Sequence, residues 1–228
     1  MGLNKQKGNM YGFITHTWNP IGGECPHKCI YCSTHSFYYP HLKKKYSGPP
    51  VLIKEELNTN LGRGKFIFVV GQNDLFAEEI HSEWIAEIIN HCIGYPDNTY
   101  LFQSKNPVGF FEWRFPLNTI LCTTIESDID YPEISKTPSV NERALAMTKL
   151  SKAGYKTMVT IEPILDFNPN MLMDYIKSIK PDYLNIGADS KGHKLPEPSP
   201  DKLKYFIEQI KELPIQLYIK QNLKRLLK

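Results

Sequence analysis

Residues 25–32 of the chain read CPHKCIYC and contain three of its five cysteines. Cys25, Cys29 and Cys32 follow a C-x3-C-x2-C spacing, close enough in sequence for three thiolates to surround one metal centre. Soft thiolate ligands favour an iron–sulfur cluster, zinc or copper(I). Because the number of cysteines is odd and disulfides are rare in a reducing cytosol, we expect metal binding or catalysis here rather than disulfides.

The missing fourth cysteine ligand bears on which metal is bound. A structural zinc site and a ferredoxin-type cluster both require four protein ligands. The remaining cysteines, Cys92 and Cys122, lie in an apolar helical stretch and in the middle of an expected strand, where a free cysteine behaves as a small core residue. Three cysteine ligands leave one iron of a four-iron cluster open, as a chemically active cluster requires. We therefore favour an iron–sulfur cluster with an open position.

Zinc is the alternative interpretation. Neutral imidazole is a good zinc ligand, so His27, His35 or His41 could complete a Cys3His site. The chain would then be a zinc-bound nucleic-acid-binding module with no enzymatic activity. Zinc knuckles usually pair their cysteines two by two, which this spacing does not. We favour the interpretation that these histidines are solvated loop residues.

The composition is that of a globular protein. The 228 residues are 41% apolar and 22% charged, which argues for a packed core and against disorder. We expect a single domain over residues 1–228, with residues 33–65 as a loop insertion. No apolar run reaches the ~18–20 residues that span a bilayer, and the N-terminus lacks the apolar region of a secretory signal. These features predict a cytoplasmic protein without a membrane partner, and the net charge of +3 is too small to require a polyanionic one.

Short β-branched or aromatic runs alternate with helical stretches along the chain. This alternation predicts βαβ units and a mainly parallel sheet. A complete eightfold barrel takes ~250 residues, so about six units fit this length better. We expect an α/β fold with a partial (β/α)6 TIM-type barrel. The expected strands are residues 12–17, 66–70, 99–104, 119–125, 157–161, 183–186 and 215–219, and the expected helices are residues 82–92, 140–153, 170–179 and 201–211.

Polar residues follow six successive expected strands. In parallel α/β folds the chemistry lies at the carboxyl ends of the strands, so these residues predict a polar cavity mouth. Glu126 and Glu162 each stand just beyond an apolar strand run and would share that cavity if both face inward. Lys105 and Lys220 also stand at strand ends, where they could contact an anion. We interpret both as surface lysines.

The cysteine spacing, with the aromatic Tyr31 directly before the last cysteine, resembles the signature of the radical S-adenosylmethionine (radical SAM) superfamily. The resemblance implies a radical SAM core in which Cys25, Cys29 and Cys32 hold a 4Fe-4S cluster and Tyr31 packs beside it. It also implies that S-adenosyl-L-methionine binds the open iron and is cleaved to a 5′-deoxyadenosyl radical, which abstracts hydrogen from a substrate. Such chemistry requires an electron donor such as flavodoxin or ferredoxin.

Seven further segments resemble one branch of this superfamily, an uncharacterised family common in phages and their hosts. The segments are THTWNPIGG, GQNDLF, FQSKNP, TTIES, TIEPILDF, NIGADS and YIKQN, in this order over nearly the whole chain. The Gly-Gly-Glu pattern that usually binds the amino group of S-adenosylmethionine is absent, and GQND at residues 71–74 stands in its place. The resemblance implies a set of cofactor-binding candidates besides Tyr31: Asn73, Asp74, Thr124, Glu126 and Glu162. It implies no catalytic residue.

Residues 37–46 read FYYPHLKKKY and interleave aromatic rings with lysines. This combination suits stacking on single-stranded or flipped bases beside phosphates. It is also typical of a lid over a small-molecule pocket. Nucleic acid and a small metabolite therefore both stay open as substrate classes. Residues 223–228 predict the end of an amphipathic helix.

Overall fold

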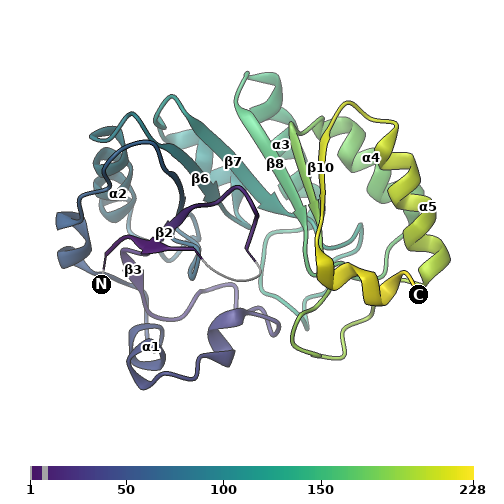
Figure 1. Ribbon diagram of the computed structural model, residues 1–228, viewed down its shortest axis with the longest axis horizontal. Helices are drawn as coiled ribbons and strands as arrows, with labels where there is room; N and C mark the ends of the chain where they lie inside the picture. The colour runs from purple at the N-terminus through teal and green to yellow at the C-terminus, as the bar shows by residue number, and fades with distance from the viewer. Residues whose placement is uncertain (1, 7–9) are drawn as a thin grey trace.

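A curved sheet of eight strands forms the centre of the computed structural model, which describes residues 2–6 and 10–228 (Figure 1). The strand order is β1-β2-β5-β6-β7-β8-β9-β10. β1 and β2 pair antiparallel, and the other neighbours in this sheet pair parallel. The strands are β1 Asn4–Lys5, β2 His16–Trp18, β5 Phe66–Val69, β6 Thr99–Gln103, β7 Thr119–Thr124, β8 Lys156–Ile161, β9 Tyr183–Ile186 and β10 Gln216–Ile219. A separate antiparallel pair consists of β3 Ile21–Gly22 and β4 Val51–Leu52.

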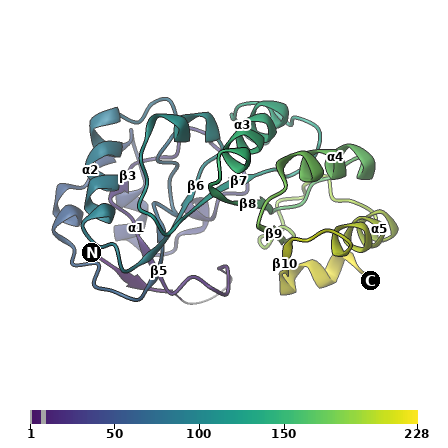
Figure 2. The same ribbon diagram turned by 90° about the horizontal axis from the view of Figure 1, so that it is seen from above.

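A helix follows each strand of the parallel sheet from β5 to β9. These helices are α2 Ser82–Ile93, the 3-10 helix η3 Pro107–Glu112, α3 Val140–Lys152, α4 Pro169–Ile179 and α5 Pro200–Lys211. Figures 1 and 2 show α2 and α5 near opposite ends of the curved sheet. Because the crossovers run in one direction, the carboxyl ends of these strands open on the same edge. The remaining helices are η1 Ser33–Ser36, α1 Pro40–Lys45, η2 Lys54–Asn58 and η4 Gln221–Leu226.

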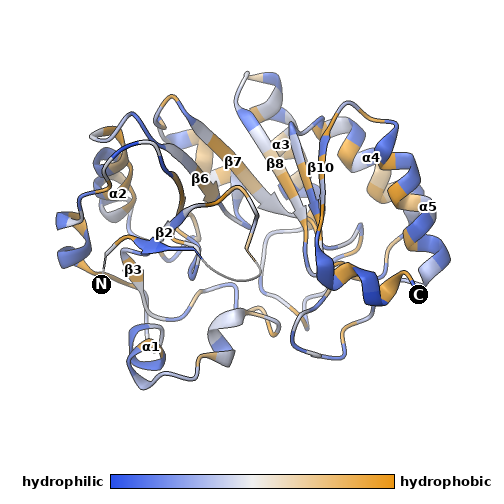
Figure 3. Ribbon diagram, viewed as in Figure 1, coloured by the Kyte–Doolittle hydropathy of each residue, from blue (hydrophilic) through white to orange (hydrophobic). Residues whose placement is uncertain are grey.

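The helices are placed by their caps and their apolar faces. The Ser139 side chain accepts from the Glu142 amide and the Glu142 side chain accepts from the Ser139 amide, a capping box that starts α3. α4 buries Leu172, Met173, Ile176 and Ile179 at helical spacing. Figure 3 shows hydrophobic and hydrophilic residues mixed along α4 and α5, as amphipathic helices that cover a sheet require.

The predicted α/β fold with a partial, mainly parallel barrel is confirmed. The expected strands from residue 66 onward and all four expected helices are present, with ends that shift by one residue or so. Residues 33–65 contain η1, α1, β4 and η2 and add no strand to the eight-stranded sheet. Residues 223–228 do not extend an α-helix, because the chain there ends in the 3-10 helix η4. Within residues 2–6 and 10–228, no helix combines the length and the apolar character needed to cross a bilayer.

The prediction of a strand over residues 12–17 is wrong for residues 12–15. β2 begins only at His16, and the residues before it pack against the inner face of the sheet. Tyr11 and Ile14 are buried there, the Ile14 amide donates to the Tyr11 carbonyl, and the Tyr11 hydroxyl donates to Gln103 at 2.9 Å. The ring of Phe13 lies 5.2 Å from that of Tyr218 on β10. Aromatic packing across the open barrel therefore outweighs strand pairing in this segment.

Candidate functional site

The three cysteines of the predicted cluster lie in one loop between β3 and η1. Cys29 is buried, whereas Cys25 and Cys32 are partly exposed, and all three thiols are free. A backbone turn follows each cysteine, since each cysteine carbonyl accepts a hydrogen bond from the amide three residues later. Thiols spaced by successive turns can face one centre without support from distant segments.

His27 fixes this loop to the rest of the protein. One ring nitrogen lies 2.8 Å from the carboxylate of Asp74, and the other lies 3.1 Å from the Lys136 carbonyl. The Lys136 amide donates back to the His27 carbonyl at 2.7 Å. Burial disfavours the imidazolium, but Asp74 outweighs this and raises the pKa of His27 above its ordinary value. The interpretation of His27 as a solvated loop residue is wrong, because the residue is buried. Both of its ring nitrogens are engaged, and a zinc site that used His27 would have to break these contacts.

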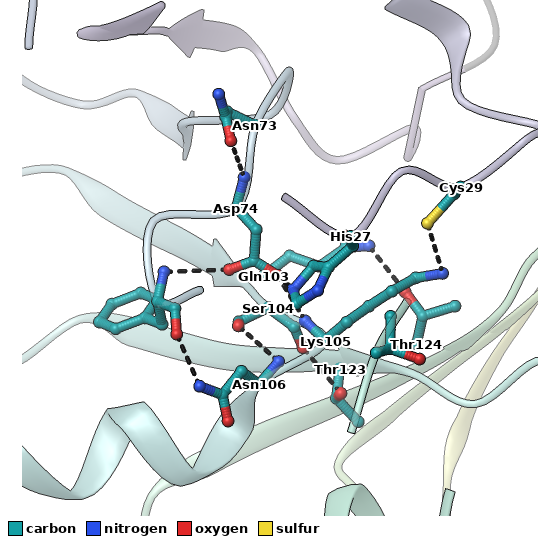
Figure 4. Close-up of polar contacts among 12 residues, drawn as sticks. His27, Cys29, Asn73, Asp74, Gln103, Ser104, Lys105, Asn106, Thr123 and Thr124 are labelled. Atoms are coloured by element: carbon teal, nitrogen blue, oxygen red, sulfur yellow. Dashed lines mark hydrogen bonds and ion pairs between the residues drawn. The ribbon is translucent and has the colours of Figure 1, made fainter. Parts of the chain in front are cut away.

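Asn73 and Asp74, the candidates for the amino group of S-adenosylmethionine, hold the loop from the other side. The Asn73 amide donates to the carbonyls of Gly22 and Gly23, just before the cysteines. Asp74 accepts from His27 and from the Lys105 amide at 2.7 Å (Figure 4). Burial raises the pKa of Asp74, but His27 outweighs it and lowers that pKa. Their contacts give both residues a positioning role, and their contact with the cofactor stays a prediction.

The cysteines are the donor type that an iron–sulfur cluster takes, and two of the three thiols have a hydrogen-bond donor beside them. The Lys105 ammonium lies 3.2 Å from the Cys29 sulfur, and the Thr34 hydroxyl lies 3.1 Å from the Cys32 sulfur. Burial raises the pKa of the Cys29 thiol, and Lys105 opposes this shift. Within residues 2–6 and 10–228, no three His, Cys, Asp or Glu side chains are gathered closely enough to hold a metal ion. The three cysteines therefore match an iron–sulfur cluster in their chemistry, and their thiols would lose their protons and draw together on binding it.

A buried charge network adjoins the cysteine loop at the ends of β6 and β7. Glu126 bonds to the Lys105 ammonium and the Tyr31 hydroxyl through one oxygen, and to Arg143 at 2.8 Å through the other. The Lys105 ammonium also lies 4.6 Å from the centre of the Tyr31 ring. Burial raises the pKa of Glu126, but Lys105 and Arg143 outweigh it and hold that pKa well below its ordinary value. Tyr31 is thus tied to the barrel through Glu126.

A second polar network crosses the inner face of the sheet. Glu162 lies 2.9 Å from the Lys220 ammonium and accepts from Asn185 at 3.1 Å. On the neighbouring strands, Gln103 donates to the Thr124 hydroxyl at 3.2 Å. Glu126 and Glu162 therefore belong to different networks, the first with two cations and the second with one. A cavity of about 480 Å³ beside the second network is lined by Tyr11, Asn185, Lys220 and other residues of β10 and the N-terminal segment.

Sequence interpretation was wrong for the two strand-end lysines and missed Arg143. Lys105 is buried, and Lys220 is largely buried against Glu162, so neither is a surface lysine. Arg143 is 3% exposed and lines a cavity of about 1110 Å³ together with Glu126 and His27. Its position was a usable signal, because it falls in the buried stripe of α3 that Val140 and Met147 define.

The chain is a half-barrel α/β protein with a three-cysteine loop at its carboxyl edge, and solved structures share this fold. A spore photoproduct lyase mutant with bound AdoMet and dinucleoside spore photoproduct has 12% identity and a TM-score of 0.58, over 94% of this chain and 67% of that one. A second spore photoproduct lyase mutant reaches a TM-score of 0.64 at 12% identity, over 94% and 79%. Streptococcus suis SuiB bound to precursor peptide SuiA gives 0.60 at 10% identity, over 89% and 48%. No protein-family model matches the sequence, and no curated protein matches it.

Proposed function

We propose that this protein is a radical SAM enzyme, with a 4Fe-4S cluster held by Cys25, Cys29 and Cys32. The observation that carries the proposal is a loop of three free cysteines at the carboxyl edge of a half-barrel, with Lys105 beside one thiol. Cys92 and Cys122 are fully buried in the core, away from this loop. When bound, the cluster would supply the electron that cleaves S-adenosylmethionine and so starts hydrogen abstraction from the substrate.

The chain's own residues would bind the charged groups of S-adenosylmethionine. We assign its carboxylate to Lys105, a buried ammonium next to a cluster ligand. Thr124, Glu126 and Glu162 stay the candidates for its ribose and methionine groups. Of the two glutamates, Glu162 is partly exposed, pairs with one cation and lies next to Asn185 and Lys220, which line a cavity, so we expect it to bind the ligand directly. Glu126 would hold Lys105 and Tyr31 in place for the same ligand.

For the substrate we propose a nucleotide or a nucleic acid. The bound dinucleoside in a lyase of similar fold supports this class, whereas the precursor peptide on SuiB supports a peptide. Binding that weakens steeply with salt would favour nucleic acid, because phosphate contacts release counterions. We also propose that the protein works in the cytoplasm with a flavodoxin or ferredoxin as donor. The likeness to the phage-associated family stays a hypothesis.

The proposed function is tested by anaerobic reconstitution with iron and sulfide, followed by electron paramagnetic resonance of the reduced protein. We expect a four-iron signal that shifts when S-adenosylmethionine is added. Cys29→Ala should abolish the signal, and Cys92→Ala, which removes a buried thiol outside the loop, should retain it. A colourless protein that holds one zinc and ignores S-adenosylmethionine would contradict the proposal and favour a zinc-bound module.

A further inference from the structure

Residues 24–48, which we call the cysteine segment, form an excursion whose two ends meet. The Gly23 amide donates to the Lys45 carbonyl at 2.8 Å, and the Glu24 amide donates to the Gly48 carbonyl at 2.8 Å. The segment holds the three cysteines together with η1 and α1. Figure 1 shows α1 set apart from the central sheet, below it in that view. The thiols and α1 therefore belong to one excursion of the chain.

The cysteine loop has an inner and an outer side. His27 and Cys29 are buried and face Asp74 and Lys105, as their contacts show. Lys28, between them, is exposed, and Ile30 is 43% exposed. Inner residues thus alternate with outer ones. Cys25 and Cys32 are themselves partly exposed, so the cysteine loop lies at the surface of the protein.

The remainder of the segment continues this outer surface. Tyr38 is 86% exposed and Tyr39 is 59% exposed, which is unusual for two adjacent aromatic residues. Lys43 and Lys44 are exposed as well. Lys45, by contrast, turns inward, with its ammonium 2.9 Å from the Asn19 carbonyl and 3.4 Å from Glu56. The packing of Phe37 on the buried Tyr46, with ring centres 5.4 Å apart, anchors the segment from beneath.

The net positive charge of the chain is concentrated in the cysteine segment. It carries four lysines against one acidic residue, Glu24, so its formal net charge of +3 equals that of the whole chain. The rest of the chain is therefore balanced. A small exposed aromatic centre with lysines around it is the composition of a protein-binding surface, and clustered positive charge favours an acidic partner and speeds the encounter.

We propose that the outer side of the cysteine segment is the docking surface for an acidic one-electron donor protein, with Tyr38, Tyr39, Lys43 and Lys44 as its main contacts. This inference rests on the proposed function, because it requires a cluster on the three cysteines. Electron transfer weakens steeply with distance, and two of the three cysteines of this segment, Cys25 and Cys32, are partly exposed. Complexes of redox proteins are small and transient, so a few exposed side chains are enough.

Nucleic acid is the other macromolecule that lysines and tyrosines could bind, and the arrangement of the loop favours the donor protein. A strand on the outer side would be separated from Lys105 and Glu126 by the loop itself, because His27, Cys29 and Tyr31 fill the inner side. A reacting nucleotide must reach the inner side. An electron needs only to cross the loop.

The test compares two reductants on the reconstituted full chain. Lys43→Glu with Lys44→Glu reverses two charges outside the cluster ligands, and Lys177→Glu with Lys204→Glu makes the same charge change on exposed positions of α4 and α5. With reduced flavodoxin at low salt, we expect the first variant to cleave S-adenosylmethionine at least ~10-fold more slowly than the parent, and the difference to shrink as salt rises. With dithionite, a small reductant that needs no docking surface, both variants should match the parent.

Each outcome has one meaning. An unchanged flavodoxin-driven rate in the first variant, with dithionite-driven cleavage intact, would overturn the docking surface and leave the proposed function standing. Loss of single-stranded DNA or RNA binding without loss of the flavodoxin-driven rate would also overturn it and assign the surface to nucleic acid. A parent protein that fails to cleave S-adenosylmethionine even with dithionite would overturn the proposed function, and the docking proposal with it.

Discussion

Glu126 and Glu162 follow neighbouring strands of the sheet, but they differ in burial and in the groups that they bond. Glu126 is 4% exposed and bonds to two cations, Lys105 and Arg143, and to the Tyr31 hydroxyl. Glu162 is partly exposed, with one cation, Lys220, and an amide from Asn185. A carboxylate whose oxygens are all occupied by buried partners cannot easily exchange them for a ligand, because an unpaired buried charge is costly.

This difference indicates a structural role for Glu126 and a ligand-binding role for Glu162. Glu126 connects three parts of the protein. It bonds to Tyr31 of the cysteine loop, to Lys105 just after β6, and to Arg143 on α3. Glu162 lies on the side of the sheet where Lys220 and Asn185 line a cavity. We therefore expect substitutions at Glu126 to act mainly on stability, and those at Glu162 to act mainly on ligand binding.

The largest effect is expected for Glu126→Gln. The substitution leaves two buried cations without a counter-charge, and breaking a buried ion pair from one side costs about 3–5 kcal/mol. Denaturant unfolding of the purified protein would measure it. Glu162→Gln is the matched control and should cost less, since it leaves one cation without a counter-charge instead of two and its pair is less deeply buried. Equal losses of stability in the two variants would contradict the structural role that we assign to Glu126.

The pH dependence of stability should report on the charge of Glu126. Lys105 and Arg143 outweigh burial and lower the pKa of Glu126, so its contribution to stability is present at neutral pH and is lost as the pH falls through its lowered pKa. That loss begins near the ordinary carboxyl range, at about pH 4–5. We expect the stability gap between the parent and Glu126→Gln to narrow as the pH falls below that range. A gap of constant size down to low pH, measured by denaturant unfolding, would show that Glu126 is not ionised in its network.

The sheet and its helices could be predicted from the sequence because their signals are local. β-branched runs, the Ser139 cap and the apolar spacing of α4 each lie within a few residues, and their element boundaries are nearly correct. The cysteine loop was also visible, since its ligands are close in sequence. The N-terminal segment was not, because its packing depends on Tyr218 and Gln103, far along the chain.

The charge networks could be predicted only in part, for the same reason. A lysine at a strand end looks like a surface lysine until its partner is known, and the partner of Lys105 is 21 residues away. Arg143 is recognisable as a buried arginine from its place in the stripe of α3, but nothing local indicates that Glu126 neutralises it. Long-range pairing of charges leaves no periodic pattern in a sequence.

The affinity for S-adenosylmethionine should depend on Glu162. If Glu162 binds S-adenosylmethionine directly, Glu162→Gln should weaken binding by about tenfold, which corresponds to about 1.4 kcal/mol. Isothermal titration calorimetry with the reconstituted protein would measure the change. Glu142→Gln, which alters an exposed carboxylate in the α3 cap, is the control and should leave affinity unchanged. Unchanged affinity in Glu162→Gln would remove the residue from the binding site.

The smallest effect is expected for Gly187→Ala, which moves Glu162 without changing its charge. A β-carbon at residue 187 would lie 2.8 Å from the Glu162 carboxyl carbon, so this flexible side chain must shift while the backbone stays in place. We expect a loss of affinity smaller than that of Glu162→Gln, because the carboxylate keeps its charge and changes only its position. Because both substitutions act through one carboxylate, the double variant should bind no more weakly than Glu162→Gln alone. Additive losses of affinity in the double variant would mean that the Gly187 substitution weakens binding by another route. The position of the Glu162 carboxylate would then not determine the affinity for S-adenosylmethionine.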